Sequence, residues 1–386
     1  MALNALGRVW AEVNLDALRN NFHAAKSLLG GKKMLVVLKA DAYGHGSKEV
    51  AECLAEEGVD MFGVASIEEG IELRKEGIRT PILILSPTPY DGVEGIFEYS
   101  LTPTVTEPQF AKILTREAKK WGVRVKIHIE VDTGMGRTGF SMDEALDFIK
   151  DVKRNPHLDL EGIFTHFPAA DSDREFTALQ IRRFEKLLKR LSRAGVNPPL
   201  THTANSAAFL NIRESWFDMI RPGLIIYGIL PAKTDENISL KPVLSLKTRV
   251  VNLRYLPKGT SISYNRTFTT KSDSMIAVLS VGYGDGYPRA LSNKGEVLIK
   301  GRRAKIVGTV CMDLTMVDVN GFDNIKIDDE VTLIGEIGKE RITVNEVASW
   351  ADTIPYEITS RISPRVPRVY IGDGRIKKVK TLLNRR

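Results

Sequence analysis

The feature that most constrains the fold is an alternation of short β-rich runs with amphipathic helical stretches between about residues 34 and 228. The eight β-rich runs are MLVVLKA, MFGVAS, PILILS, TPTVT, VRVKIHIEVD, LEGIFTHF, PLTHTANS and DMIRPGLIIYG. Helical patterns between them include SKEVAECLAEEG, SIEEGIELRKEG, SMDEALDFIKDVKR and DREFTALQIRRFEKLLKRLSRAG, each opened by Ser or Asp. Consecutive strand–helix units of this number predict an α/β fold closed into a (β/α)₈ TIM-like barrel.

The character of the sequence changes after the polar, proline-bounded stretch PAKTDENISLKP, which runs from Pro231 to Pro242. Beyond it, strand-like runs separated by Lys-Gly, Asp-Gly and Asn-containing turns predict a mainly β domain. We therefore expect a barrel domain at residues 1–240 and a β-rich domain at residues 241–386. The opening run RVWAEVNL is also strand-like, and the sequence leaves open which domain this first strand, at about residues 9–15, joins.

Composition argues against several other classes of protein. No apolar run approaches the roughly 20 residues of a membrane span, and the N-terminal residues do not resemble a secretory signal. Cys53 and Cys311 are too few for a disulfide framework and lack zinc-site spacing, which favours a reducing compartment. The net charge of +7 is spread along the chain except for the tail GRIKKVKTLLNRR. We expect a cytoplasmic protein with no metal, no membrane partner and no nucleic-acid partner.

Polar residues suited to catalysis fall at the carboxyl ends of the predicted barrel strands, where such barrels carry their active sites. These residues are Lys39, Arg137, His166, Ser206 and Arg221. Lys39 ends the apolar strand of VVLKADAYGHG and precedes a loop of small residues. Burial there would favour a neutral amine, which can form a Schiff base with an aldehyde cofactor. The same segment alone also fits a lysine that extends past the strand end into solvent.

Six motifs in a fixed order decide between these alternatives: VLKADAYGHG, VDTGMGRTGF, HTANSA, IRPGLIIYG, SISYNRTF and VGTVCMDLTMVDV. Together they resemble alanine racemase, and the resemblance extends from the first strand to RVPRVY near the C-terminus. It implies a fold-type III enzyme that uses pyridoxal 5′-phosphate (PLP), with a barrel followed by a β domain, acting as a homodimer. It also implies interconversion of L- and D-alanine, with D-alanine supplied to peptidoglycan.

By this resemblance, Lys39 binds PLP covalently and, once freed by the incoming amino acid, serves one face of the reacting carbon. Racemisation needs a second acid–base group on the opposite face, and the family's counterpart is Tyr264, supplied by the partner subunit. His166 and Arg221 match the residues that support this tyrosine. Arg221 is expected beside the ring nitrogen of PLP, where a guanidinium donates a hydrogen bond but no proton and keeps the ring a weak electron sink.

The resemblance implies the other contacts as well. The phosphate contacts are Tyr43, Asn205, Ser206, Gly223, Leu224 and Tyr356. Arg137 faces the cofactor's phenolic oxygen and the substrate carboxylate, which also receives the backbone amide of Met312 from the partner subunit, with Asp313 as an orienting neighbour. The residues matching the pocket entrance are Ala169, Asp171, Tyr283, Arg289, Ile354 and Tyr356. A small, crowded entrance implies alanine as the substrate.

Three positions depart from the family pattern. Glu130 stands where many relatives carry a lysine modified to a carbamate, and we expect its built-in negative charge to hold Arg137. Thr309 replaces a frequent arginine, and Asn265 replaces a frequent glycine beside Tyr264. These two changes leave serine or another small amino acid open as a substrate.

Two other functions compete with racemisation. A PLP decarboxylase of basic amino acids shares the barrel-plus-β architecture, but that class generally pairs the ring nitrogen with a carboxylate, so Arg221 and Tyr264 argue against it. A PLP-holding regulatory barrel usually lacks a second domain, whereas about 140 residues follow Leu240 in this chain.

Overall fold

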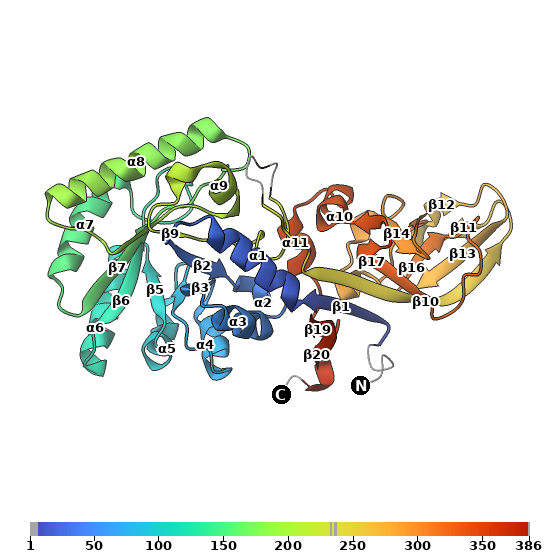
Figure 1. Cartoon of the computed structure of the whole chain (residues 1–386), viewed down its shortest axis with the longest axis horizontal. Coiled ribbons are helices and arrows are strands. Elements are labelled where there is room, and N and C mark those ends of the chain that lie inside the picture. Colours follow the sequence, from blue (N-terminus) through green and yellow to red (C-terminus); the bar gives the residue numbers. More distant parts are fainter. Residues whose placement is uncertain (1–6, 232–233, 235–237, 385–386) are drawn as a thin grey trace.

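The computed structural model describes residues 7–231, 234 and 238–384. Of the predicted boundary segment, residues 232–233 and 235–237 lie outside this described part, as do the last two residues of the basic tail. Figure 1 shows an elongated molecule with a helix-covered barrel at one end and a mainly β region at the other. No helix in the described ranges combines the length and the apolar character that crossing a membrane requires.

Eight strands of a parallel sheet form the barrel, and each overlaps one of the predicted runs. They are β2 (Lys33–Val37), β3 (Met61–Val64), β4 (Ile82–Ile84), β5 (Thr102–Val105), β6 (Val125–Glu130), β7 (Leu158–Phe164), β8 (Leu200–His202) and β9 (Met219–Ile220). Hydrogen-bonded neighbours follow the order β8-β7-β6-β5-β4-β3-β2-β9. The ring closes between β8 and β9, where Asp218 N donates to Thr201 O at 3.0 Å. A second closing bond joins Arg221 N to Ala204 O at 2.8 Å. The predicted barrel is confirmed.

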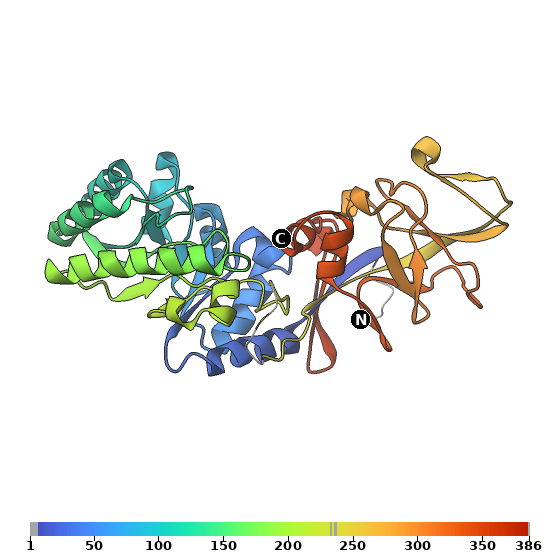
Figure 2. The ribbon, with the colours of Figure 1, turned by 90° about the horizontal axis from the view of Figure 1, so that it is seen from above.

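Helices connect and cover these strands, as the view from above in Figure 2 also shows. They are α1 (Leu15–Ser27), α3 (Ser47–Glu56), α4 (Ile67–Lys75), α5 (Val93–Glu98), α6 (Pro108–Trp121), α7 (Met142–Arg154), α8 (Arg174–Arg193) and α9 (Ser206–Asn211). Ser66, Ser141 and Asp173 cap α4, α7 and α8 by accepting hydrogen bonds from backbone amides. Helix α3 begins at the predicted Ser47, but this serine does not cap it. Gly46 is its N-cap, and the Ser47 amide donates to Asp41 Oδ1 at 2.8 Å.

The segment after Lys39 is not the predicted loop but a left-handed helical turn, α2 (Lys39–Tyr43). Four of its five residues, Ala40, Asp41, Ala42 and Tyr43, have φ angles of 53° or 54°. Each non-glycine residue in this conformation costs roughly 1–2 kcal/mol because Cβ crowds the backbone. Contacts from the surrounding structure must therefore hold the turn.

His45 supplies two of these contacts. Its Nδ1 lies 2.9 Å from Ala42 O and 3.0 Å from Tyr43 O, and because carbonyls only accept, Nδ1 carries the proton. The ring is fully buried and stacks on Tyr227 with centroids 4.4 Å apart. Burial lowers the pKa of His45 to about 4, so the ring stays neutral at physiological pH.

Replacing His45 with Ala is expected to lower the free energy of unfolding by about 1–3 kcal/mol, because the two turn carbonyls lose their donor inside the protein. Urea unfolding of the cofactor-free protein measures this loss. The control is His23→Ala, at an exposed histidine paired with Glu57, which should change stability little. Equal midpoints for the two variants would contradict the anchoring role of His45.

A second sheet, of ten strands, forms the mainly β region, with the order β15-β14-β17-β10-β1-β19-β20 and with β13, β16 and β18 joined at its side. Its strands are β1 (Val9–Asn14), β10 (Leu244–Leu256), β13 (Ser274–Leu279), β14 (Glu296–Ile299), β15 (Arg302–Lys305), β16 (Thr315–Asp318), β17 (Glu330–Ile337), β18 (Glu340–Ile342), β19 (Arg368–Gly372) and β20 (Arg375–Lys380). The short strands β11 (Ser261–Ile262) and β12 (Phe268–Thr269) pair separately. Strand β1, which the sequence leaves open, pairs antiparallel with β10 and parallel with β19, so it lies in this sheet.

This region also contains two α-helices that the sequence analysis does not predict, α10 (Val344–Trp350) and α11 (Pro355–Ser360). Figure 1 shows α11 between the barrel and the second sheet. Short 3₁₀ turns complete the fold: η2 (Tyr90–Gly92), η3 (Arg213–Ser215), η4 (Tyr264–Arg266), η5 (Tyr283–Asp285), η6 (Arg289–Leu291) and η7 (Leu382–Asn384). Helix α11 matters for function because it approaches α2.

Candidate active site

A cavity of about 300 Å³ lies at the carboxyl ends of the barrel strands. Its lining contains nine of the residues singled out in the sequence: Lys39, Tyr43, Arg137, His166, Asn205, Ser206, Arg221, Gly223 and Tyr356. Val37, Leu85, Ser86, Pro87, Thr138 and Phe164 complete it. The structure thus brings the candidate barrel residues together around one space.

Lys39 lies two residues after the end of β2 and begins the left-handed turn α2. Its amine forms no hydrogen bond or ion pair with another residue in the described ranges. The pKa of Lys39 is lowered by burial and by the positive charges of Arg137 and Arg221, against the opposing effect of Glu69. The cavity therefore holds an unpaired amine whose neutral form is favoured.

Arg221 follows β9, and its guanidinium is nearly saturated with neutral acceptors. Nη1 donates to His202 Nδ1 and to His202 O, both at 2.9 Å. Nη2 donates to Thr165 O at 2.9 Å and Thr203 O at 3.1 Å, with His166 Nδ1 at 3.2 Å. Nε–H has no partner among the described residues, so one donor remains for a ligand. Burial lowers the pKa of Arg221 to about 10, which leaves it charged at neutral pH.

Small and hydroxyl-bearing residues form another part of the cavity. Ser206 Oγ accepts a hydrogen bond from Gly223 N at 2.9 Å. A Cβ at Gly223 would lie 2.7 Å from the Tyr43 hydroxyl oxygen, so the backbone approaches this phenol closely only because the residue is glycine. Leu224 is buried beside Gly223 but does not line the cavity.

Tyr356 reaches the barrel cavity from α11, in the C-terminal part of the chain. Its ring packs edge-on against Tyr43 with centroids 5.5 Å apart. Gly44, at φ 82°, allows this approach, since a Cβ there would lie 2.0 Å from Thr359 O of α11. The two phenols therefore come from different regions of the same chain.

Glu130 ends β6 and lies behind Arg137. Its Oε1 is 3.9 Å from Arg137 Nη2, and its Oε2 accepts a hydrogen bond from Thr138 Oγ1 at 2.7 Å. Burial raises the pKa of Glu130, while Thr138 and Arg137 oppose that rise. The contact with Arg137 is thus electrostatic, without a direct hydrogen bond.

Other candidate residues lie outside this cavity. Tyr264, Met312 and Asp313 line a separate hollow of about 730 Å³ in the β region. Tyr264 is 68% exposed and Met312 is 54% exposed. None of the remaining entrance candidates lines the barrel cavity: Ala169, Asp171, Tyr283, Arg289 and Ile354. A single chain does not bring Tyr264 and Lys39 into one cavity.

The two departures near Tyr264 have structural explanations. Asn265 has φ 59°, a conformation in which glycine is the default and asparagine is among the best-tolerated alternatives. Thr309 is buried, and its hydroxyl donates to Tyr264 O at 3.0 Å. Thr309 therefore supports the backbone of the turn that presents Tyr264.

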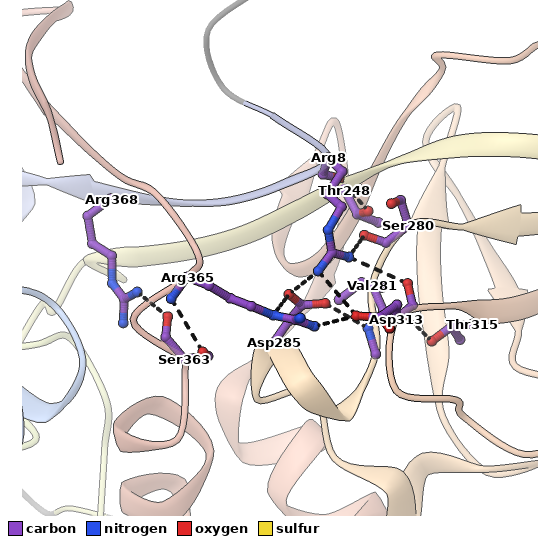
Figure 3. A network of polar contacts seen from close by, with 11 residues as sticks. Arg8, Thr248, Ser280, Val281, Asp285, Asp313, Thr315, Ser363, Arg365 and Arg368 are labelled. Carbon is purple, nitrogen blue, oxygen red and sulfur yellow. Dashed lines mark hydrogen bonds and ion pairs between the residues drawn. The ribbon is translucent and has the colours of Figure 1, made fainter. Parts of the chain in front are cut away.

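A polar network around Asp285 fixes the neighbouring loops (Figure 3). The Asp285 carboxylate, 1% exposed, accepts hydrogen bonds from Arg8 Nη2 at 2.6 Å and Arg365 Nε at 2.8 Å. Arg365 Nη2 also donates to Asp313 Oδ1 at 2.7 Å. The backbone of Gly284 donates to Met312 O at 2.9 Å, which joins the two loops directly. Arg8, just before β1, and Arg365, in the segment before β19, thus hold the loops that carry Tyr283, Met312 and Asp313.

Several residues that shape the site were missed by the sequence analysis. Glu69 accepts hydrogen bonds from Ala40 N and Ala65 N, both at 2.7 Å, and so anchors the turn after Lys39. In the sequence, Glu69 differs from the other acidic residues of α4 only by standing three residues after the cap Ser66, a spacing that indicates a local cap and not a contact with Ala40. His202 holds Arg221, and its place in the motif THTANSA is a signal that was available in the sequence.

Comparisons with known proteins agree over nearly the whole chain. The family model described as alanine racemase, N-terminal domain, matches residues 13–231, and that described as alanine racemase, C-terminal domain, matches residues 243–370. The alanine racemase of Halothermothrix orenii is 46% identical over 94% of this chain and 96% of its own length. The alanine racemase structure from Bacillus anthracis with bound L-Ala-P has a TM-score of 0.90, 37% identity and 98% coverage of both chains. That from Bartonella henselae with covalently bound pyridoxal phosphate has a TM-score of 0.87 and 27% identity, covering 95% of this chain and 100% of its own.

Proposed function

This chain belongs to the alanine racemase family, and from that premise we propose that Lys39 and Tyr264 are its two acid–base groups, brought together in a homodimer. The chain is a PLP-dependent isomerase that interconverts L- and D-alanine, the reaction that supplies D-alanine for peptidoglycan. The family and the activity that the sequence motifs indicate are confirmed.

The residues of the barrel cavity fit PLP. Lys39 offers an unpaired amine for the aldehyde, and Arg221 has one unused donor, Nε–H, for the ring nitrogen. The lining contains the cations Lys39, Arg137 and Arg221, and no carboxylate among its described residues, which suits a phosphorylated ligand. Hydroxyl groups of Tyr43, Ser206 and Tyr356, together with the backbone beside Gly223, would hold the phosphate. When bound, PLP supplies an electron sink for the charge that develops at Cα.

In the proposed mechanism, Lys39 and Tyr264 move the proton of alanine Cα on opposite faces. The lowered pKa of Lys39 favours the neutral amine that accepts this proton. Tyr264 then donates from the other face, and the roles reverse for the other enantiomer. Arg137 would bind the substrate carboxylate, because a guanidinium matches the paired oxygens of that group.

Two observations support the homodimer. Tyr264 is exposed in a hollow of the β region, together with Met312 and Asp313, and not in the cavity of Lys39. A second copy of the chain supplies these residues to the barrel cavity without any change in the fold. We also propose that the dimer acts in the cytoplasm, where the unpaired Cys53 and Cys311 would remain reduced.

The hydrogen bonds around Arg221 are the observation that favours racemisation over decarboxylation. Neutral acceptors bind the Nη hydrogens of Arg221. Its Nε–H would then face the ring nitrogen as a hydrogen-bond donor that does not release its proton. Held in this way, Arg221 would leave the ring nitrogen of bound PLP without a proton, which would favour rapid return of the proton to Cα. Incubation with L-alanine, L-serine and L-lysine tests this proposal. Loss of optical activity, fastest for L-alanine, is expected, whereas carbon dioxide release from lysine would refute it.

Glu130→Gln is expected to raise KM for L-alanine by about 3- to 10-fold, because the guanidinium of Arg137 loses the buried negative charge behind it. The amide oxygen of Gln still accepts the hydrogen bond from Thr138, so packing should persist. Initial-rate kinetics measure the effect, with Thr138→Val as the control that removes only the hydrogen bond. Unchanged KM and kcat in Glu130→Gln would refute this role of Glu130.

A further inference from the structure

A line of polar side chains runs from the buried Arg221 through two buried histidines to Glu161 and the exposed Lys126. His202 Nε2 lies 2.8 Å from His128 Nδ1, and both rings are fully buried. His128 Nε2 lies 3.4 Å from Glu161 Oε2. The other oxygen of Glu161 pairs with the exposed Lys126 at 2.7 Å. With the bond from Arg221 to His202, these contacts form one continuous chain.

The two ends of this chain determine where every proton sits. Arginine only donates, so His202 Nδ1 accepts and the proton of this neutral ring is on Nε2. That proton points to His128 Nδ1, which must accept in turn, so the proton of His128 is also on Nε2. A carboxylate only accepts, and Glu161 therefore completes the sequence. Reversing either histidine would place two donors or two acceptors face to face.

The two histidines remain neutral in this arrangement. Burial lowers the pKa of both rings, and the positive charge of Arg221 acts in the same direction. For His128, Glu161 acts in the opposite direction and Lys126 supports the lowering. Protonation of either histidine, which would place a second positive charge near the guanidinium, is therefore disfavoured. The two neutral rings still fix which atom donates and which accepts in each hydrogen bond of the line.

We propose that Glu161 is a positioning residue for Arg221: it fixes the proton positions of His128 and His202 and thereby keeps His202 Nδ1 as the acceptor that orients the guanidinium. This inference rests on the proposed role of Arg221 beside the PLP ring. Glu161 is the bulge residue of β7, between Leu160 and Gly162, which pair with Ile127 and His128 of β6, and it does not line the cofactor cavity. Its effect on the site is transmitted through two neutral rings.

Nitrogen-15 NMR of the histidine rings in the cofactor-free protein tests the proton positions directly. We expect His128 and His202 to be neutral with the proton on Nε2, with assignments made from His128→Gln and His202→Gln. A proton on Nδ1 of His202 would overturn the proposal, even in an enzyme of normal activity. Absence of racemase activity would refute the proposed function and leave these proton positions unaffected, so the two failures are distinguishable.

Matched variants at Glu161 test the connection to the cofactor site. Glu161→Leu removes the acceptor and should give His202 a mixture of tautomers, with a PLP dissociation constant raised about 5- to 10-fold. Glu161→Gln keeps an acceptor oxygen and should stay within about twofold of wild type. Lys126→Ala, the control, removes only the outer partner of Glu161 and should leave the tautomers unchanged.

Wild-type NMR spectra and wild-type PLP affinity in Glu161→Leu would overturn the proposal. Cofactor absorbance titration gives the affinities, and circular dichroism verifies that each variant is folded. If Glu161→Leu does not fold, the tautomers of the wild-type protein and of Glu161→Gln still decide the outcome: retention of the Nε2 protons supports the chain, and their absence refutes it.

Discussion

Lys39→Ala is expected to lower kcat/KM for alanine racemisation by about 10⁴-fold or more, because the variant loses both the covalent attachment of PLP and one of the two proton-transferring groups. No other lysine lines the cavity among the described residues, so none is placed to replace it. The substitution removes the lysine amine of the site, whose pKa burial and the charges of Arg137 and Arg221 lower.

Borohydride reduction followed by denaturation provides a measurement independent of turnover. Wild-type protein should retain the reduced cofactor covalently, whereas Lys39→Ala should release it. Lys33→Ala, at the exposed start of β2, is the control and should behave like wild type. Retention of covalent cofactor in Lys39→Ala would place the attachment at another residue.

Tyr264→Phe is expected to lower kcat by about 10²–10⁴-fold while PLP affinity stays within about twofold, because only the proton-carrying hydroxyl is removed. The Tyr264 ring is exposed in the single chain, so removing its hydroxyl group should not disturb the fold. Tyr255→Phe is a suitable control, since Tyr255 is also exposed, at 64%, and its hydroxyl contacts only Asp273 among the described residues. Equal activity of wild type and Tyr264→Phe would refute the two-base assignment.

Mixing the two inactive variants tests whether the sites are shared between subunits. In a dimer of Lys39→Ala with Tyr264→Phe, one site would receive both intact residues and the other would receive neither. Random exchange of subunits should then restore roughly one quarter of wild-type activity. If Tyr264 served the cavity of its own chain, every site in the mixture would carry one defect, and activity would stay absent.

The barrel was predictable because its signals are local. Each strand overlaps a short apolar run, and Ser66, Ser141 and Asp173 mark helix starts by capping chemistry that operates within three residues. The left-handed turn after Lys39 was not predictable in this way. Its Ala and Tyr residues do not favour positive φ, and the bond to Ala40 N comes from Glu69, 29 positions along the chain. The pairing of β1 with β10 likewise depends on partners more than 200 positions away.

The same distinction applies to the candidate site. Lys39, His166 and Arg221 could be selected because each follows a strand whose end faces the common cavity. Tyr356 was accessible only through the family resemblance, since its position depends on the packing of α11 against α2. The contact between His128 and His202 joins β6 to β8, and no pattern along the sequence relates two residues 74 positions apart.

The close packing of α2 against α11 restricts how this enzyme can move. The Gly44 backbone lies directly against Thr359 O, and Arg368 of β19 donates to Gly44 O at 3.1 Å. Rotation of the barrel relative to the β region would break this bond and separate Tyr43 from Tyr356. This packing therefore opposes hinge motion of the barrel relative to the β region. A compound that wedges α2 away from α11 would therefore shift the turn that begins at Lys39 without entering the substrate pocket.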